Sequence, residues 1–238
     1  MDIGEIIGDA IAYPLHNIKS LVIYMIIGIV GGILGGASLI AMLSSASGNN
    51  ALAAGGFGFI GILILIIASL LISGYGLDIV KFGIERRDDG PGIDIVRQIA
   101  NAIKLIIVSI VYYIIPAIAG WLLSTLLGNG ILTTIIILII YIVFAFAQFM
   151  ATCRLAKYDS LGEALAIGEA IGDISKVGMI KVLITVIAVF VIGFIIAFII
   201  TLIMQNINAT IGGILLGIFA VYFTFFSNRA MGLLYSDV

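Results

Sequence analysis

Six uninterrupted apolar stretches dominate this 238-residue chain and restrict what it can fold into. They cover residues 20–43, 57–77, 105–127, 131–153, 182–204 and 212–234. About 20 apolar residues suffice to cross the hydrocarbon core of a bilayer as an α-helix. A backbone in lipid must also satisfy its hydrogen bonds within its own segment, which favours helices. The sequence therefore predicts an all-α integral membrane protein with six transmembrane helices in one membrane domain, residues 1–238.

The overall composition excludes several other classes of protein. The chain is 63% hydrophobic and 10% charged, and its mean hydropathy of +1.32 leaves too little polar surface for a water-soluble fold. The apolar runs do not alternate with polar residues, as the strands of outer-membrane barrels do. A net charge of -2 with scattered cations gives no basic stripe for a phosphate backbone. We therefore expect the lipid bilayer as the surroundings of this chain and no nucleic-acid partner.

The links between the apolar stretches alternate sharply in charge. Residues 44–56, 128–130 and 205–211 contain no charged residue, whereas residues 78–104 and 154–181 are rich in them. All eleven Lys and Arg residues fall on the side of the two charged links and the termini. Cytoplasmic loops carry the excess of Lys and Arg in membrane proteins. The pattern predicts a multi-pass cell-membrane protein whose N- and C-termini are both cytoplasmic.

The three odd-numbered spans begin alike. Ile18-Lys19, Ile103-Lys104 and Ile180-Lys181 each end a polar segment with helical amphipathicity and are followed by an apolar run. The pattern favours a unit used three times: a cytoplasmic amphipathic helix that covers the ends of the spans, then a hairpin of two spans. The expected repeats cover residues 1–77, 91–153 and 160–235. Alternatively, a Lys at the cytoplasmic boundary of each span could produce the same matches without true repetition.

Small residues recur along several spans. They predict faces where two helices approach closely, because the absence of a large side chain permits tight van der Waals contact in lipid. The expected packing positions are Gly28, Gly32, Gly36, Gly193, Ala197, Gly213 and Gly217. Packing within the chain is the leading interpretation, and contact with a second copy or another membrane protein is the alternative. Pro116 lies inside the third span and is expected to kink it.

Residues that could carry chemistry are sparse. No Asp, Glu, Lys or Arg lies near the midplane of a span, which disfavours an ion-coupled pump. A single cysteine, Cys153, and a single histidine, His16, provide neither an internal disulfide nor a zinc cluster. The carboxylates of the charged links lie among Lys and Arg and are interpreted as solvated. We therefore expect no catalytic, cofactor-binding or metal site.

Three functions remain open at this level. The leading hypothesis is a non-enzymatic scaffold or partner-binding membrane subunit, since the spans hold no buried charge and no catalytic cluster. The first alternative is a passive channel or small-solute transporter. Its polar lining would have to come from Ser69, Ser73, Ser109, Thr185, Thr201 and Thr224. The second alternative is a lipid-modifying membrane enzyme that uses the cytoplasmic carboxylates.

Short motifs around the second and third spans resemble a known family. Gly74-Tyr75 is followed by a charged link, Pro91, and an apolar run that contains Tyr113-Ile114-Ile115-Pro116. With the segment from Tyr158 to Glu163, this order is similar to domain-of-unknown-function family 4013, a largely archaeal group of multi-span membrane proteins. The resemblance implies six spans and a prokaryotic cell membrane. It implies no activity and assigns no functional residues.

Overall fold

The structure, a computed structural model, describes residues 1–48, 51–207 and 209–238. These residues form α-helices joined by short links, without any β-strand among them. In chain order the helices are α1 (Ile3–His16), α2 (Ile18–Ser47), α3 (Ala51–Ile84), α4 (Ile95–Leu127), α5 (Ile131–Tyr158), α6 (Leu161–Ala164), α7 (Ile167–Val177), α8 (Met179–Asn206) and α9 (Ala209–Tyr235).

Within the described residues, six helices are long and apolar enough to cross a membrane, namely α2, α3, α4, α5, α8 and α9. Each contains one of the six predicted apolar stretches. The predicted all-α, six-span architecture is therefore confirmed, and the chain is a polytopic helical membrane protein. Several long helices extend beyond the apolar stretches into the charged links, and these extensions carry Lys81 of α3, Arg97 and Lys104 of α4, and Arg154 and Lys157 of α5.

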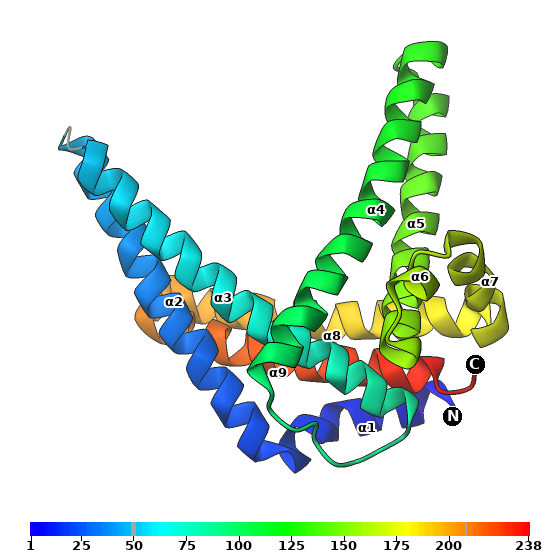
Figure 1. Cartoon of the computed structure of the whole chain (residues 1–238), viewed down its shortest axis with the longest axis horizontal. Coiled ribbons are helices and arrows are strands. Elements are labelled where there is room, and N and C mark those ends of the chain that lie inside the picture. The colour runs from blue at the N-terminus through cyan, green and yellow to red at the C-terminus, as the bar shows by residue number, and fades with distance from the viewer. Residues whose placement is uncertain (49–50, 208) are drawn as a thin grey trace.

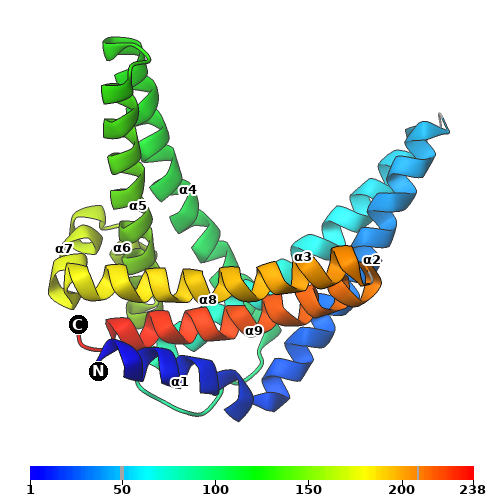
Figure 2. The ribbon, with the colours of Figure 1, turned by 180° about the vertical axis from the view of Figure 1, so that it is seen from behind.

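Consecutive long helices lie side by side as α2 with α3, α4 with α5, and α8 with α9. Figure 1 shows the first two pairs diverging upward from a common lower region, while the third pair lies across the back, as Figure 2 shows from behind. We call this lower region the base. It contains α1, α6, α7, the link 85–94 and the adjoining ends of the long helices. Both chain termini lie there.

Most of the large buried side chains lie in the base. Tyr24, Tyr75, Tyr112 and Tyr235 are each at most 1% exposed. Side chains near the far ends of the hairpins are open instead, as at Ile131, which is 83% exposed. Lipid covers such apolar side chains as well as protein does, so their exposure from the bundle costs little in a membrane. The contacts that fix the three pairs relative to one another are therefore concentrated in the base.

The amphipathic segments before the three hairpins behave differently from one another. α1 is separate and begins with a capping box, in which Asp2 accepts from the Glu5 amide and Glu5 accepts from the Asp2 amide, both at 2.8 Å. α7 is also separate and ends at Gly178, whose φ of 102° suits glycine. Asn17 after α1 and Gly178 after α7 interrupt the helices there, so both helices can turn away from the spans that follow.

The expected amphipathic helix within 91–104 is not a separate element, which corrects the prediction. Asp94 caps the start of α4 by accepting from the Arg97 amide at 3.0 Å, and the helix then continues to Leu127. The reason is local, since no glycine or proline interrupts the chain between Asp94 and Pro116. Pro116 is buried within α4, with helix on both sides of it.

The close contacts of α2 among the described residues lie at Gly28, which is one of the expected packing positions, and at Gly31 and Gly35. An added Cβ at Gly28 would lie 3.1 Å from a side chain of α9, and at Gly31 and Gly35 it would lie 2.8 and 2.6 Å from side chains of α3. Gly32 is exposed, with no other heavy atom within 4 Å of such a Cβ. Gly36 lies outside the residues whose surroundings the structure describes. Neighbouring helices therefore contact positions 28, 31 and 35, because two partners approach α2 from slightly different directions.

The small residues of α8 and α9 also differ among themselves. An added Cβ at Gly193 would lie 2.5 Å from the ring of Phe223, so α8 and α9 depend on this glycine for their close approach. An added Cβ at Gly217 would only be in ordinary contact with Ile29 of α2, at 3.9 Å. Ala197 is partly exposed, and Gly213 lies outside the residues whose surroundings are described. Of the two expected packing glycines of this pair whose surroundings are described, only Gly193 is thus needed for a close helix contact.

Candidate functional site

A polar cavity lies between the spans, next to the base. Its volume is about 430 Å³, which falls within the range of small-molecule sites. Helices α3, α4, α5 and α9 provide its lining, which consists of Ser69, Leu70, Ser73, Ala102, Leu105, Ile106, Ser109, Thr152, Thr224 and Asn228. None of these ten residues is charged. The lining therefore combines hydroxyl and amide groups with apolar side chains.

Four of the six residues named above as a polar pore lining border this one cavity: Ser69, Ser73, Ser109 and Thr224. Thr185 borders a separate apolar cavity of about 200 Å³ between α5, α8 and α9, and its buried hydroxyl has no hydrogen-bond partner in the described structure. Thr201 is exposed and donates to the Ala197 carbonyl at 2.8 Å. Thr152 also borders the cavity but was not among the six, because the rotation of α5 that places it there is not evident in the sequence.

Hydrogen bonds within the helices occupy several donors of the lining. The hydroxyl of Thr152 donates to the carbonyl of Gln148 at 3.0 Å, and that of Thr224 to the carbonyl of Ala220 at 2.8 Å. The Asn228 amide donates to the Thr224 carbonyl at 2.7 Å. Both hydroxyls keep lone pairs, and Asn228 keeps its side-chain oxygen, as hydrogen-bond acceptors. The cavity therefore suits an uncharged ligand that carries O–H or N–H donors.

Below this cavity, α3 and α4 are joined by an ion pair. Arg97 Nε and Nη2 donate to Asp78 Oδ2 at 3.2 and 3.1 Å, and Asn101 Nδ2 donates to Asp78 Oδ1 at 2.9 Å. Asp78 is 7% exposed. The interpretation of the link carboxylates as solvated is therefore incorrect for Asp78. The carboxylate is buried because a guanidinium and an amide replace its water.

A second ion-pair network surrounds Arg229 near the end of α9. This side chain is 1% exposed. Its Nε lies 2.7 Å from Asp9 Oδ1 in α1, and its Nη2 lies 3.1 Å from Asp88 Oδ1 in the link 85–94. Nη1 donates to the backbone carbonyl of Arg87. One side chain therefore ties α1, the link and α9 together.

A third network holds α7 against α5 and α9. Its centre is Asp173, which is fully buried and again departs from the expected solvated carboxylate. Arg154 Nη1 and Lys176 Nζ lie 3.0 and 2.7 Å from the carboxylate, and the hydroxyl of Tyr235 donates to it. Burial alone would raise the pKa of Asp173, but the hydrogen bonds from Lys176, Tyr235 and Arg154 outweigh it and hold this pKa below its usual value.

Acidification should weaken this third network. The folded chain binds a proton at Asp173 less readily than the unfolded chain does, where the pKa of an Asp is about 3.9. The stabilisation is therefore complete at neutral pH and is lost as the pH falls below about 4 towards the folded pKa. We expect the melting temperature in detergent to drop in this range, and the drop to be smaller in Asp173→Asn. Identical acid profiles of the two proteins would contradict the assignment.

Close packing of α2, α3 and α4 explains the motif Gly74-Tyr75. An added Cβ at Gly74 would overlap the backbone of Gln98, so the two helices cross in direct contact there. The ring of Tyr75 stacks on that of Tyr24 with centroids 4.3 Å apart, and its hydroxyl donates to the Pro91 carbonyl at 3.1 Å. The hydroxyl of Tyr24 donates to Gln98 Oε1 at 2.6 Å. Glycine, tyrosine and proline of the motif thus meet in one place.

Other reactive groups are not gathered at the cavity. Cys153 is buried, with its sulfur 3.8 Å from the Met231 carbonyl in α9. Among the described residues, no group of three His, Cys, Asp or Glu side chains could share a metal ion. The described carboxylates nearest the cavity, such as Asp78, are engaged in ion pairs of the base. The chemistry that the cavity itself offers is hydrogen bonding.

Comparison with known proteins agrees with the motif. A family model described as a protein of unknown function (DUF4013) matches residues 57–205, from α3 to α8. No curated protein and no solved structure matches the chain significantly. The matched segment contains Gly74, Tyr75 and Pro91, and the cavity lining except for Thr224 and Asn228. Since this segment is more than half of the 238 residues, the chain belongs to the DUF4013 family, whose function is unknown.

Proposed function

We propose that the protein is a passive carrier of small uncharged polar solutes across a membrane, and that the cavity of about 430 Å³ is its solute site. The observation that supports this proposal is the lining, where hydroxyl and amide groups converge within otherwise apolar spans. A polar solute that leaves water without new hydrogen bonds loses several kcal/mol, about 2 to 7 for an amide or hydroxyl. Acceptors such as Thr152, Thr224 and Asn228 would replace those bonds.

Solute flux through reconstituted liposomes tests this role. We expect glycerol to equilibrate faster into liposomes that contain the protein than into protein-free ones. Ser73→Leu combined with Ser109→Leu fills the cavity with apolar side chains and should return the flux towards the protein-free rate. Thr201→Leu is the matched control, because Thr201 is exposed on α8 and lies outside the lining. Equal flux in all three proteins would refute the carrier.

A non-enzymatic scaffold is the second candidate function. It is supported by the divergence of the α2–α3 and α4–α5 pairs (Figure 1) and by the large apolar side chains that are exposed among their described residues. Trp121, for example, is 68% exposed. Helices of a second copy or of another membrane protein could cover these side chains in place of lipid. Co-purification of a stoichiometric partner from the native membrane, together with absent glycerol flux, would favour this role over the carrier.

We further propose that the base faces the cytoplasm, as the distribution of all eleven Lys and Arg residues indicates. In a Cys153→Ala background, a cysteine at Asn129, between α4 and α5, should react with a membrane-impermeant thiol reagent in intact cells. A cysteine at Asp88, which is exposed in the base, should remain unlabelled until the cells are opened. The reverse pattern would invert the orientation.

A further inference from the structure

A second, smaller cavity lies between α3, α4 and α5 on the base side of the solute site. Its volume is about 70 Å³, and its lining includes Leu77, Asp78, Arg97, Asn101, Leu155 and Asp159. All three helices also line the larger cavity. In contrast to the larger cavity, this one contains charged groups of both signs. It therefore lies between the uncharged larger cavity and the charged surface of the base.

The two linings follow each other along the same helices. Residues three or four apart lie on one face of a helix, about one turn of 5.4 Å from each other. The neighbouring members of the two linings are Ser73 and Leu77 on α3, Leu105 and Asn101 on α4, and Thr152 and Leu155 on α5. Leu77 and Leu155 are buried, at 4% and 1% exposure, and separate the two cavities.

We propose that this smaller cavity is the base-side part of the solute path, and that the ion pair between Asp78 and Arg97 closes it. The inference rests on the carrier function proposed above. Asp78 is fixed on the inner side by Asn101, at 2.9 Å. Arg97 lies on the outer side, where its side chain is 45% exposed and also donates to the Gly92 carbonyl. The pair therefore spans the path from buried Asp78 to the solvent-exposed side chain of Arg97.

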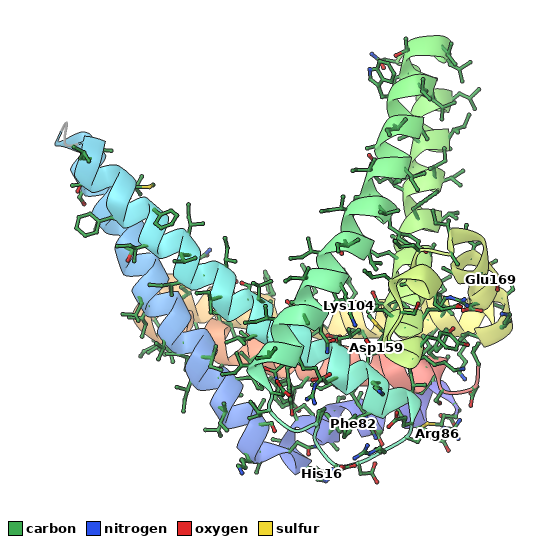
Figure 3. The ribbon with its side chains drawn as sticks, in the orientation of Figure 1. His16, Phe82, Arg86, Lys104, Asp159 and Glu169 are labelled. Atoms are coloured by element: carbon green, nitrogen blue, oxygen red, sulfur yellow. The ribbon has the colours of Figure 1, made fainter. Side chains whose placement is uncertain are left out.

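Opening this path requires the Arg97 guanidinium to leave Asp78. The guanidinium is already partly in solvent, whereas the buried Asp78 carboxylate keeps the hydrogen bond from Asn101 and needs water that enters the path. The mouth is bounded by a second pair, in which Lys104 Nζ and Asp159 Oδ1 are 2.5 Å apart. Figure 3 shows these two side chains lying toward each other from α4 and the end of α5. Asp159 is 71% exposed, so the mouth reaches solvent.

Thiol labelling from each side of the membrane tests the proposal. The reporter is Ser73→Cys in a Cys153→Ala background, and the probe is a membrane-impermeant methanethiosulfonate. A cysteine at Asp88 identifies whether intact cells or inverted vesicles expose the base. From that side, Asp78→Ala and Arg97→Ala should each raise the labelling rate of Ser73→Cys by about tenfold or more, the factor expected when a charge-assisted hydrogen bond is lost. Glu85→Ala, which removes an exposed carboxylate of the same region, should leave the rate unchanged.

Asp78→Ala and Arg97→Ala in a protein that keeps Ser73 and the native Cys153 distinguish an opened path from a loosened base. Cys153 is buried beside α9 and borders neither cavity. Faster labelling of Ser73→Cys with Cys153 still protected would support the path. Unchanged labelling, or equal labelling of Cys153, would overturn it. Labelling does not depend on solute passage, so the two proposals can fail separately. Faster labelling of the variants in a protein that passes no glycerol would refute the carrier alone. Glycerol flux with unchanged labelling would refute the path alone.

Discussion

Asp9→Asn should destabilise the folded protein by about 3 to 5 kcal/mol, the usual cost of breaking a buried ion pair from one side. Arg229 is 1% exposed, and Asp9 is its nearest carboxylate, at 2.7 Å. The other carboxylate, Asp88, lies on an exposed link and is itself hydrated, with 87% of its side chain open. The substitution keeps the shape of residue 9 but leaves a buried guanidinium without its main counter-charge. Unfolding by denaturant in detergent micelles measures the loss.

Two further variants show whether burial is the cause. Glu85→Gln removes a carboxylate whose ion pair with Arg87, at 3.5 Å, is exposed on both sides, so it should cost only about 0 to 1 kcal/mol. Adding Arg229→Met to Asp9→Asn removes both charges and should recover part of the lost stability. If Asp9→Asn cost no more than Glu85→Gln, Arg229 would have to be hydrated in the folded protein.

The partners of Arg229 could not be predicted from the sequence, because they come from distant parts of the chain. Asp9 precedes it by 220 residues, and hydropathy indicates only that an arginine at the end of a span avoids lipid. Which carboxylate it meets depends on how α1 lies across α9, and that is decided by the crossing of helices from different hairpins. The same applies to Asp173, whose partners Arg154 and Tyr235 belong to α5 and α9.

The spans themselves were predictable, because bilayer thickness sets their length and lipid sets their composition. The continuity of α4 was predictable in principle as well, since no helix breaker lies between Asp94 and Pro116. The amphipathic pattern before this span led to a different expectation, although amphipathicity indicates which face is covered and not where a helix ends. Chain breakers such as Gly178 carry that second kind of information.

The cavity was predictable only in part. Serine and threonine are conspicuous in apolar spans, and four of the six that the sequence analysis named border one cavity. Thr185 and Thr201 do not, because their helix, α8, contributes no residue to the lining. Rotation of a span in lipid is set by its neighbours and not by water, so polarity alone does not determine which hydroxyls converge.

The crossing of α3 and α4 at Gly74 combines a feature that is visible in the sequence with one that only the packing of the helices explains. A glycine next to a tyrosine is visible in the sequence, but its reason lies in the backbone of Gln98, which occupies the space that a Cβ would need. The stacked rings of Tyr75 and Tyr24 lie immediately beside this contact. A shift of α4 away from Gly74 would therefore also disturb the hydrogen bond of Tyr24 to Gln98 and that of Tyr75 to Pro91.

Gly74→Ala should consequently lower the free energy of unfolding by about 3 kcal/mol, the upper end of the usual cost of overpacking, because a backbone cannot move aside as a flexible side chain can. Gly32→Ala is the matched control. It adds the same methyl group to a spanning helix where no other heavy atom lies within 4 Å, and alanine is the better helix former by about 1 kcal/mol. The control should therefore be at least as stable as the parent protein in thermal unfolding in detergent. Equal melting temperatures of the two variants would mean that α3 and α4 do not cross at Gly74.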